Sequence, residues 1–147
     1  MNVIPLRPRP PVATTQEQPG GGSDLVIELQ PAIDGLRSLR SDVESYYWGC
    51  PTDGSEDSER FEVSYWIRQL SDRSTALEGI LLHKGSSRLR LRDVSTAEAA
   101  TLEDAAVALK EWVHDDDPFD RVLRIVSAAL AAADRTGLRA AGGTPEA

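Results

Sequence analysis

The chain contains a single cysteine, Cys50, so it cannot form a disulfide bond within itself. It has two histidines, and no Cys or His stands at the spacing that a zinc site requires. No apolar run approaches the roughly 20 residues of a membrane-spanning helix, and the N-terminus lacks the continuous apolar segment of a signal peptide. We therefore expect a cytoplasmic protein that has no membrane segment, no metal and no cofactor.

Aromatic residues are also scarce, at 5% of the 147 residues, whereas aliphatic residues and alanine are plentiful. The core is therefore expected to be aliphatic, and the length suits one domain. The formal net charge of -8 disfavours direct binding to the phosphate backbone of a nucleic acid. The sequence has no glycine-rich phosphate loop and no serine-nucleophile motif. These absences argue against an enzyme.

The strongest helix signals lie in residues 95–137, where two helices joined by a short acidic turn are predicted. Ser95 and Glu98 form a capping box that begins the first helix. Asp117 is the expected N-cap of the second helix, and Pro118 suits its first position. The connection has about four residues, which favours antiparallel neighbours. The two apolar stripes are Leu102, Ala105, Ala106, Leu109, Trp112 and Val113, and then Phe119, Val122, Leu123, Val126, Leu130 and Ala133.

Residues 59–83 carry two competing patterns. Apolar residues alternate from Phe61 to Ile67, which is typical of a strand. A longer pattern has the spacing of a helix seam, and it consists of Val63, Ile67, Leu70, Ser74, Leu77 and Leu81. Because the second pattern is much longer and contains no proline, a long helix is predicted.

A further helix is expected to start at Ser23 or Asp24 and to run to about Tyr47. Pro31 conflicts with a helix interior, because proline lacks the N–H group and clashes with the preceding turn. The alternative is that residues 25–29 form a separate short element and that the helix begins at Pro31. Residues 88–94 alternate arginine with leucine, which indicates an extended segment or a crossover held to acidic helices by salt bridges.

Together these patterns predict an all-α fold, a four-helix bundle-like domain of two long and two shorter helices over residues 23–139. Residues 1–22 contain five prolines and end in three glycines, which predicts a disordered arm. Residues 140–147 are rich in Gly, Pro and Ala and are expected to form a short flexible tail.

The candidate interface residues lie at the end of the first helix and in the loop after it. Successive helix residues are turned by roughly 100°, so three neighbouring aromatic side chains cannot all face one core. At least one ring should be exposed beside the acidic loop, although the rings could instead close the end of the bundle. The candidates are Tyr46, Tyr47, Trp48, Asp53, Glu56 and Asp57.

These observations favour a noncatalytic protein–protein interaction module, which would be an adaptor, assembly subunit or regulatory partner of a bacterium or phage. Its partner would be another protein or further copies of the chain. The first alternative is an acidic inhibitor that imitates nucleic acid at a basic site of its partner. The second is a small magnesium-dependent helical hydrolase, because Asp116, Asp117 and Asp120 have a spacing that can chelate a hard cation. Helix capping explains Asp117 and Asp120 more simply, so no metal site is assigned.

Overall fold

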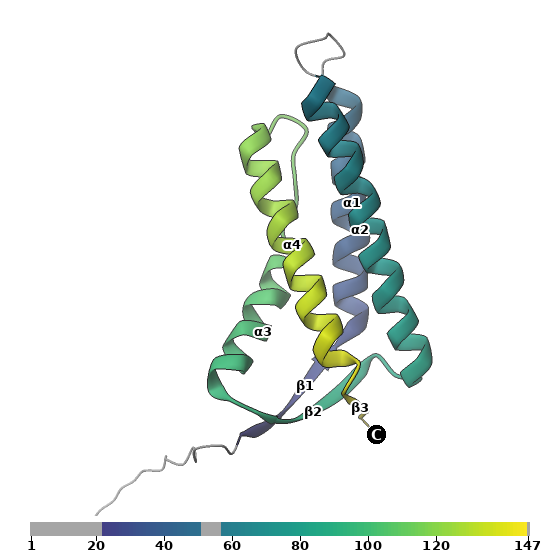
Figure 1. Cartoon of the computed structure of the whole chain (residues 1–147), viewed down its shortest axis with the longest axis vertical. Coiled ribbons are helices and arrows are strands. Elements are labelled where there is room, and N and C mark those ends of the chain that lie inside the picture. The colour runs from purple at the N-terminus through teal and green to yellow at the C-terminus, as the bar shows by residue number, and fades with distance from the viewer. Residues whose placement is uncertain (1–21, 51–56, 147) are drawn as a thin grey trace, which may run out of the picture.

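The computed structural model describes residues 22–50 and 57–146. Within them the fold is a four-helix, bundle-like arrangement with a small antiparallel sheet at one end (Figure 1). The helices are α1 (Leu29–Gly49), α2 (Asp57–Lys84), α3 (Thr96–Ala108) and α4 (Phe119–Ala140). The strands are β1 (Ser23–Glu28), β2 (Arg88–Val94) and β3 (Thr144–Pro145), in the sheet order β1-β2-β3. The predicted helical bundle is confirmed, and the sheet is an addition to it.

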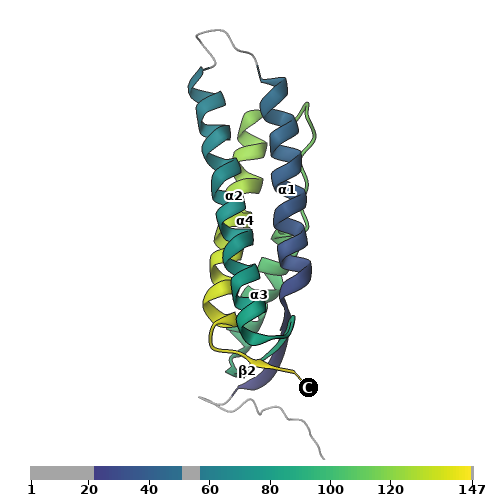
Figure 2. The same cartoon turned by 90° about the vertical axis from the view of Figure 1, so that its right-hand side faces the viewer.

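Helices α1, α2 and α4 run side by side along the molecule, as both side views show (Figures 1 and 2). Their inward faces form the main core, which is aliphatic as the composition predicts. The largest fully buried side chains include Leu36, Leu39 and Val43 of α1, Val63, Leu70 and Leu77 of α2, and Val122 and Val126 of α4. A second, smaller cluster beneath the sheet joins Leu91 and Val94 of β2 to Leu102 of α3.

Residues 59–83 lie in one helix, α2, so the seam interpretation is confirmed and the strand interpretation of residues 61–67 is excluded. Seam positions Val63, Leu70, Ser74 and Leu77 are buried. The side chain of Ser74 satisfies its hydroxyl locally by donating to the carbonyl oxygen of Ser71, 2.9 Å away. This bond explains how a polar residue occupies a core position.

The predicted helix start at Ser23 or Asp24 is wrong, because residues 23–28 form strand β1 and α1 begins at Leu29. Leu29 donates its backbone N–H to the Ser87 carbonyl oxygen at 2.8 Å, and the Gln30 N–H goes to the Ser87 hydroxyl at 2.8 Å. A distant residue therefore caps α1 in place of a local N-cap side chain. Pro31 falls in the first turn of α1, where its missing N–H costs nothing.

The sheet brings the arginine segment against acidic residues of β1. Leu25 and Ile27 face the helices, opposite Leu91 and Leu89, and the neighbouring positions face outward. The outward positions carry ion pairs between Arg88 and Glu28, between Arg90 and Asp24, and between Arg90 and Glu146. Residues 88–94 are thus an extended, salt-bridged segment as the sequence indicates, but its acidic partners lie in β1 and after β3 and not on helices.

The C-terminal segment differs from the flexible tail predicted for residues 140–147. After α4 the backbone turns at Gly142 and Gly143, and Thr144–Pro145 pairs with β2. The Glu146 N–H donates to the Arg88 carbonyl oxygen at 2.9 Å, and its carboxylate pairs with Arg90. These nonlocal contacts, which composition does not reveal, hold the segment through Glu146.

Helix α3 begins as predicted, because the Ser95 hydroxyl accepts from the Glu98 N–H at 3.1 Å. The helix ends at Ala108, however, and residues 109–118 form a longer connection than the four residues expected. Leu109 and Val113 remain buried in this non-helical connection, whereas Trp112 is exposed. The ion pair between Glu98 and Arg139 joins the start of α3 to the end of α4, so the two helices are antiparallel as predicted.

Gly35 marks the closest approach of α1 to the residue after α3. A Cβ atom built at Gly35 would lie 2.0 Å from the backbone carbonyl oxygen of Leu109. Because a backbone atom yields less readily than a flexible side chain, Gly35→Ala should lower the free energy of unfolding by about 1–3 kcal/mol, as overpacking does.

The matched control is Gly79→Ala in α2, where an added Cβ meets nothing within 4 Å. This change should raise the free energy of unfolding by about 0.5–1 kcal/mol, because alanine favours helix over glycine. Urea unfolding of the two variants measures both effects. Equal responses to the two substitutions would contradict the close packing described at Gly35.

Candidate functional site

The α1–α2 hairpin brings the predicted interface residues to the end of the molecule opposite the sheet (Figure 1). Residues 51–56, which join the two helices, lie outside the described residues, and so do the candidates Asp53 and Glu56. Asp57 is the first residue of α2, and the described side chains do not include its own. The aromatic candidates can therefore be placed, and the acidic ones of this loop cannot.

Tyr46, Tyr47 and Trp48 occupy three different environments in the last turns of α1. Tyr46 is buried in the core, Tyr47 is half-buried, and Trp48 is 75% exposed. The rings of Tyr47 and Trp48 meet edge to face, with centroids 5.1 Å apart. The rotation of successive residues around the helix thus directs one ring inward and one outward, as the sequence predicts.

Arg60 of α2 holds these rings from the other side of the hairpin. Its guanidinium carbon lies 4.3 Å from the centroid of the Tyr47 ring and 5.8 Å from that of Trp48. A cation over an aromatic face contributes about 0.5–1 kcal/mol at an exposed site. The contact therefore limits the positions that the exposed Trp48 side chain can adopt.

Two further exposed aromatic residues lie at this end, and neither is among the candidates named from the sequence. Phe61 and Tyr65 are 78% and 55% exposed, and they lie one turn apart on α2. The next residue, Trp66, is buried instead and packs on Phe119 of α4, with ring centroids 5.2 Å apart. The seam through Val63 and Leu70 already predicted which face of α2 is buried. Positions 61 and 65 lie off that face, so this signal could have identified them.

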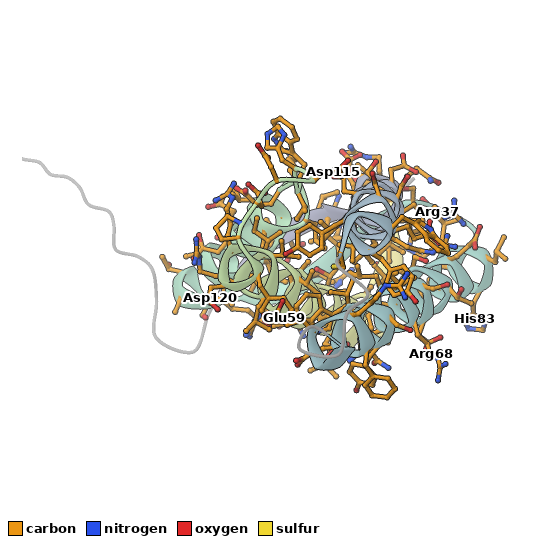
Figure 3. The ribbon with its side chains drawn as sticks, turned by 90° about the horizontal axis from the view of Figure 1, so that it is seen from above. Arg37, Glu59, Arg68, His83, Asp115 and Asp120 are labelled. Atoms are coloured by element: carbon orange, nitrogen blue, oxygen red, sulfur yellow. The ribbon has the colours of Figure 1, made fainter. Side chains whose placement is uncertain are left out.

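We call the exposed residues Trp48, Phe61 and Tyr65 the aromatic cluster. Trp48 lies in the last turn of α1, and Phe61 and Tyr65 lie in the second and third turns of α2, at the same end of the bundle. Viewed down on the molecule, Arg68, one further turn along α2, points outward from the bundle (Figure 3). The cluster therefore combines large exposed apolar rings with a charged neighbour.

The acidic turn between α3 and α4 serves structural purposes. The Asp115 carboxylate accepts from the Ser45 hydroxyl at 3.0 Å, and Asp115 lies beside α1 in the view from above (Figure 3). Asp42 of α1 accepts from the Val113 N–H at 3.3 Å. Both bonds fasten the connection to α1, which explains part of the acidic character of this region.

Asp117 does not cap α4, contrary to the prediction. Pro118 is the residue before the helix, and the Asp117 carboxylate accepts from the His114 N–H at 2.9 Å and pairs with Arg121. The hydrogen bond from His114 lowers the pKa of Asp117, and the charge of Arg121 acts in the same direction. Asp117 thus closes the turn that precedes α4.

The arginines of β2 are mostly neutralised by neighbours. Arg88 pairs with Glu28 at 2.9 Å, and Arg90 pairs with Glu146 at 2.8 Å and Asp24 at 3.4 Å. The hydrogen bond and the charge of Glu146 raise the pKa of Arg90. Arg92 is exposed and forms no ion pair with a described residue. This face of the sheet therefore carries a ladder of ion pairs within the chain.

Within residues 22–50 and 57–146, no group of three or more His, Cys, Asp or Glu residues has a geometry that could hold a metal ion. In the same part of the chain, no helix is long enough and apolar enough to cross a membrane. Comparisons with protein families, with curated proteins and with solved structures find no match for this chain. Function must therefore be argued from the surface itself.

The hydrogen bonds of Asp117 should be visible in the acid dependence of stability. A carboxylate whose pKa is lower in the folded chain stabilises the fold above its unfolded pKa, and this stabilisation is lost as the pH falls through the folded value. For Asp117 the loss should occur below its ordinary pKa of 3.8. In the wild type, protonation of Asp117 should lower the free energy of unfolding in this acid range, and Asp117→Asn should abolish that contribution. Urea unfolding at a series of pH values from neutral to acid measures the difference.

Asp116→Asn is the control, because the exposed Asp116 forms no hydrogen bond or ion pair with a described residue. It should leave the acid profile of the wild-type chain unchanged. If Asp117→Asn and the wild type lose stability in parallel over this range, the turn is not held by the Asp117 carboxylate.

Proposed function

We propose that the chain is a noncatalytic helical protein–protein interaction module, and that the aromatic cluster of Trp48, Phe61 and Tyr65 is its binding surface. The supporting observation is the exposure of three large rings at one end of a rigid hairpin. The three residues represent a large share of an aromatic content of only 5%. These three aromatic side chains are exposed and do not form part of the buried core, although the chain contains few aromatic residues.

The physical argument concerns what such rings contribute when they become buried. Each aromatic side chain removes a large apolar area from water, and it has few rotatable bonds to immobilise. Tryptophan and tyrosine are enriched among the residues that carry most of the binding energy at protein interfaces. Trp48 is already restrained by Tyr47 and Arg60, so part of the ordering cost is met before binding.

The setting that we propose is the cytoplasm of a bacterium or of a phage-infected cell, where the module would act as an adaptor, assembly subunit or regulatory partner. The support for this setting is compositional. A chain with one cysteine needs no oxidising compartment to fold. Its net charge of -8 also favours a protein partner over a nucleic acid.

The proposal predicts a separation of binding from stability. Phe61→Ala and Trp48→Ala should each weaken capture of the partner by about 2 kcal/mol or more if they remove an interface anchor. The free energy of unfolding should change by about 0.5 kcal/mol or less in Phe61→Ala, as for other exposed substitutions. Trp48→Ala also removes the contact with Arg60, which adds about 0.5–1 kcal/mol at most. The measurements are affinity capture from cells of the native host, with quantitative mass spectrometry, and thermal unfolding of the same preparations.

Leu82→Ala is the matched control, because Leu82 is an equally exposed apolar residue near the other end of α2. It should change neither capture nor stability. If the same proteins are captured by Phe61→Ala, Trp48→Ala and the wild type in equal amounts, the aromatic cluster is not the binding surface.

A further inference from the structure

An apolar groove lies at the end of the molecule opposite the aromatic cluster. It has a volume of about 340 Å³ and runs between strand β1, the start of α1 and the inward side of α3. Its apolar walls include Leu25 and Ile27 of β1, Ala32 of α1, Leu102 and Ala106 of α3, and Leu109. We call it the edge groove, because β1 is an edge strand that pairs only with β2 among the described residues.

The main chain of β1 presents unused hydrogen-bonding groups along this edge. The Leu29 N–H donates to the Ser87 carbonyl oxygen, so Leu29 and Ser87 form a hydrogen-bonded pair. Every second pair along the ladder is of the same kind, which gives Ile27 with Leu89 and Leu25 with Leu91. In an antiparallel pair only every second residue bonds to its neighbouring strand. The N–H and C=O groups of Val26, which lies between the paired residues Leu25 and Ile27, therefore point away from β2.

This edge has part of the usual protection against strand pairing, namely a register shift near Asp24 and two acidic residues, Asp24 and Glu28, that are paired with arginines of β2. Edge strands commonly carry lysine or proline, or are covered by another element. Residues 23–28 contain neither lysine nor proline, and α3 leaves the groove open beside them. A row of main-chain groups next to an apolar groove suits an occupant that has an extended backbone and apolar side chains at alternate positions.

The charged residues that line the groove indicate which charges a bound segment should carry. Glu28 is paired with Arg88, but the exposed Glu103 and Lys110, which also line the groove, form no ion pair with a described residue. An occupant that has a basic residue near one end and an acidic residue near the other would complement both. A second copy of β1 fits less well, because antiparallel pairing centred on Val26 would set Asp24 of each copy opposite Glu28 of the other, and like charges directly opposite destabilise a sheet.

We propose that the edge groove binds an extended segment of a partner protein, which adds to the sheet as a strand beside β1. The segment carries apolar residues at alternate positions and oppositely charged residues at its two ends. This interaction is separate from the one proposed at the aromatic cluster, because the two surfaces lie at opposite ends of α1.

The test uses two blocked seven-residue peptides as probes, Lys-Thr-Val-Thr-Val-Thr-Glu and its reverse, Glu-Thr-Val-Thr-Val-Thr-Lys, with the full chain. Titration followed by amide NMR should move the resonances of β1 and α3 with at least one peptide. Hydrogen exchange of the Val26 amide should be fast in the free chain and slower in the complex, because strand addition engages that group.

Methylation of single peptide nitrogens then separates strand addition from simple apolar binding. In a strand only one of two successive N–H groups faces β1. N-methylation of a peptide residue whose N–H faces β1 should weaken binding by about tenfold, which corresponds to the loss of roughly one hydrogen bond. N-methylation of the following peptide residue, whose N–H faces away from β1, should be tolerated.

Ala106→Arg, which fills the groove from α3, should weaken peptide binding by about tenfold or more through lost apolar contact and steric exclusion. Ala100→Arg is the control, because Ala100 is an exposed residue of the same helix that does not line the groove. It should bind the peptide as the wild type does, and thermal unfolding should show both variants folded.

Three results would overturn the proposal. One is that neither peptide moves the β1 and α3 resonances at millimolar concentration. Another is that N-methylation at two successive positions has equal effects, which would make the groove an apolar site without strand pairing. The third is that the Val26 amide is already protected in the free chain and loses protection on dilution, which would assign the edge to a second copy.

Discussion

The packing of α1 against α2 is the constraint on which the other features depend. The seam of α2 buries Val63, Leu70 and Leu77 against a core to which α1 contributes Leu36 and Val43. Once this seam is fixed, the helical repeat decides the direction of every other side chain on the two helices. It sends Trp66 inward onto Phe119, and it leaves Phe61 and Tyr65 facing solvent at the same end as Trp48. The aromatic cluster is thus a consequence of helical phase, and its rings rest on a rigid support.

The opposite end of the hairpin is held by contacts between residues distant in sequence. Ser87 caps α1 through its carbonyl and hydroxyl oxygens, and the β1–β2 ladder continues from that cap. The same arrangement leaves one edge of β1 without a strand partner among the described residues. One short sheet therefore both holds this end of the hairpin and leaves an unpaired strand edge among the described residues.

The sequence predicted those parts of the fold that depend on local periodicity. The seam of α2, the capping of α3 by Ser95 and the antiparallel arrangement of α3 and α4 all follow from patterns within a few turns of helix. The sheet was missed for two reasons. The two strands β1 and β2 are separated in the sequence by both α1 and α2, so no local pattern connects them. The six residues of β1 also show too little alternation to indicate a strand. The end of α3 was misplaced because Val113 is buried and bonded to Asp42 without being helical, which apolar spacing cannot distinguish from a helix.

The candidate site was predicted in part for the same reason. The rotation of successive helix residues required an exposed ring among residues 46–48, and Trp48 is that ring. Phe61 was overlooked because its alternation with Val63 and Ile67 was considered only as evidence for a strand. The Asp117 carboxylate was assigned the wrong role at the start of α4, because a capping residue and a turn-closing residue one position earlier have the same sequence signature.

We propose that the aromatic end of the hairpin contacts another protein, and this contact can be detected directly. Its most direct test is photocrosslinking in cells of the native host, with a benzoyl-phenylalanine residue in place of Phe61 and, in a parallel strain, in place of Leu82. The account predicts a discrete crosslinked product from position 61 that identifies one partner, and no such product from position 82. Identical crosslinking from both positions, or none from position 61 while the folded chain is present at its normal level, would contradict it.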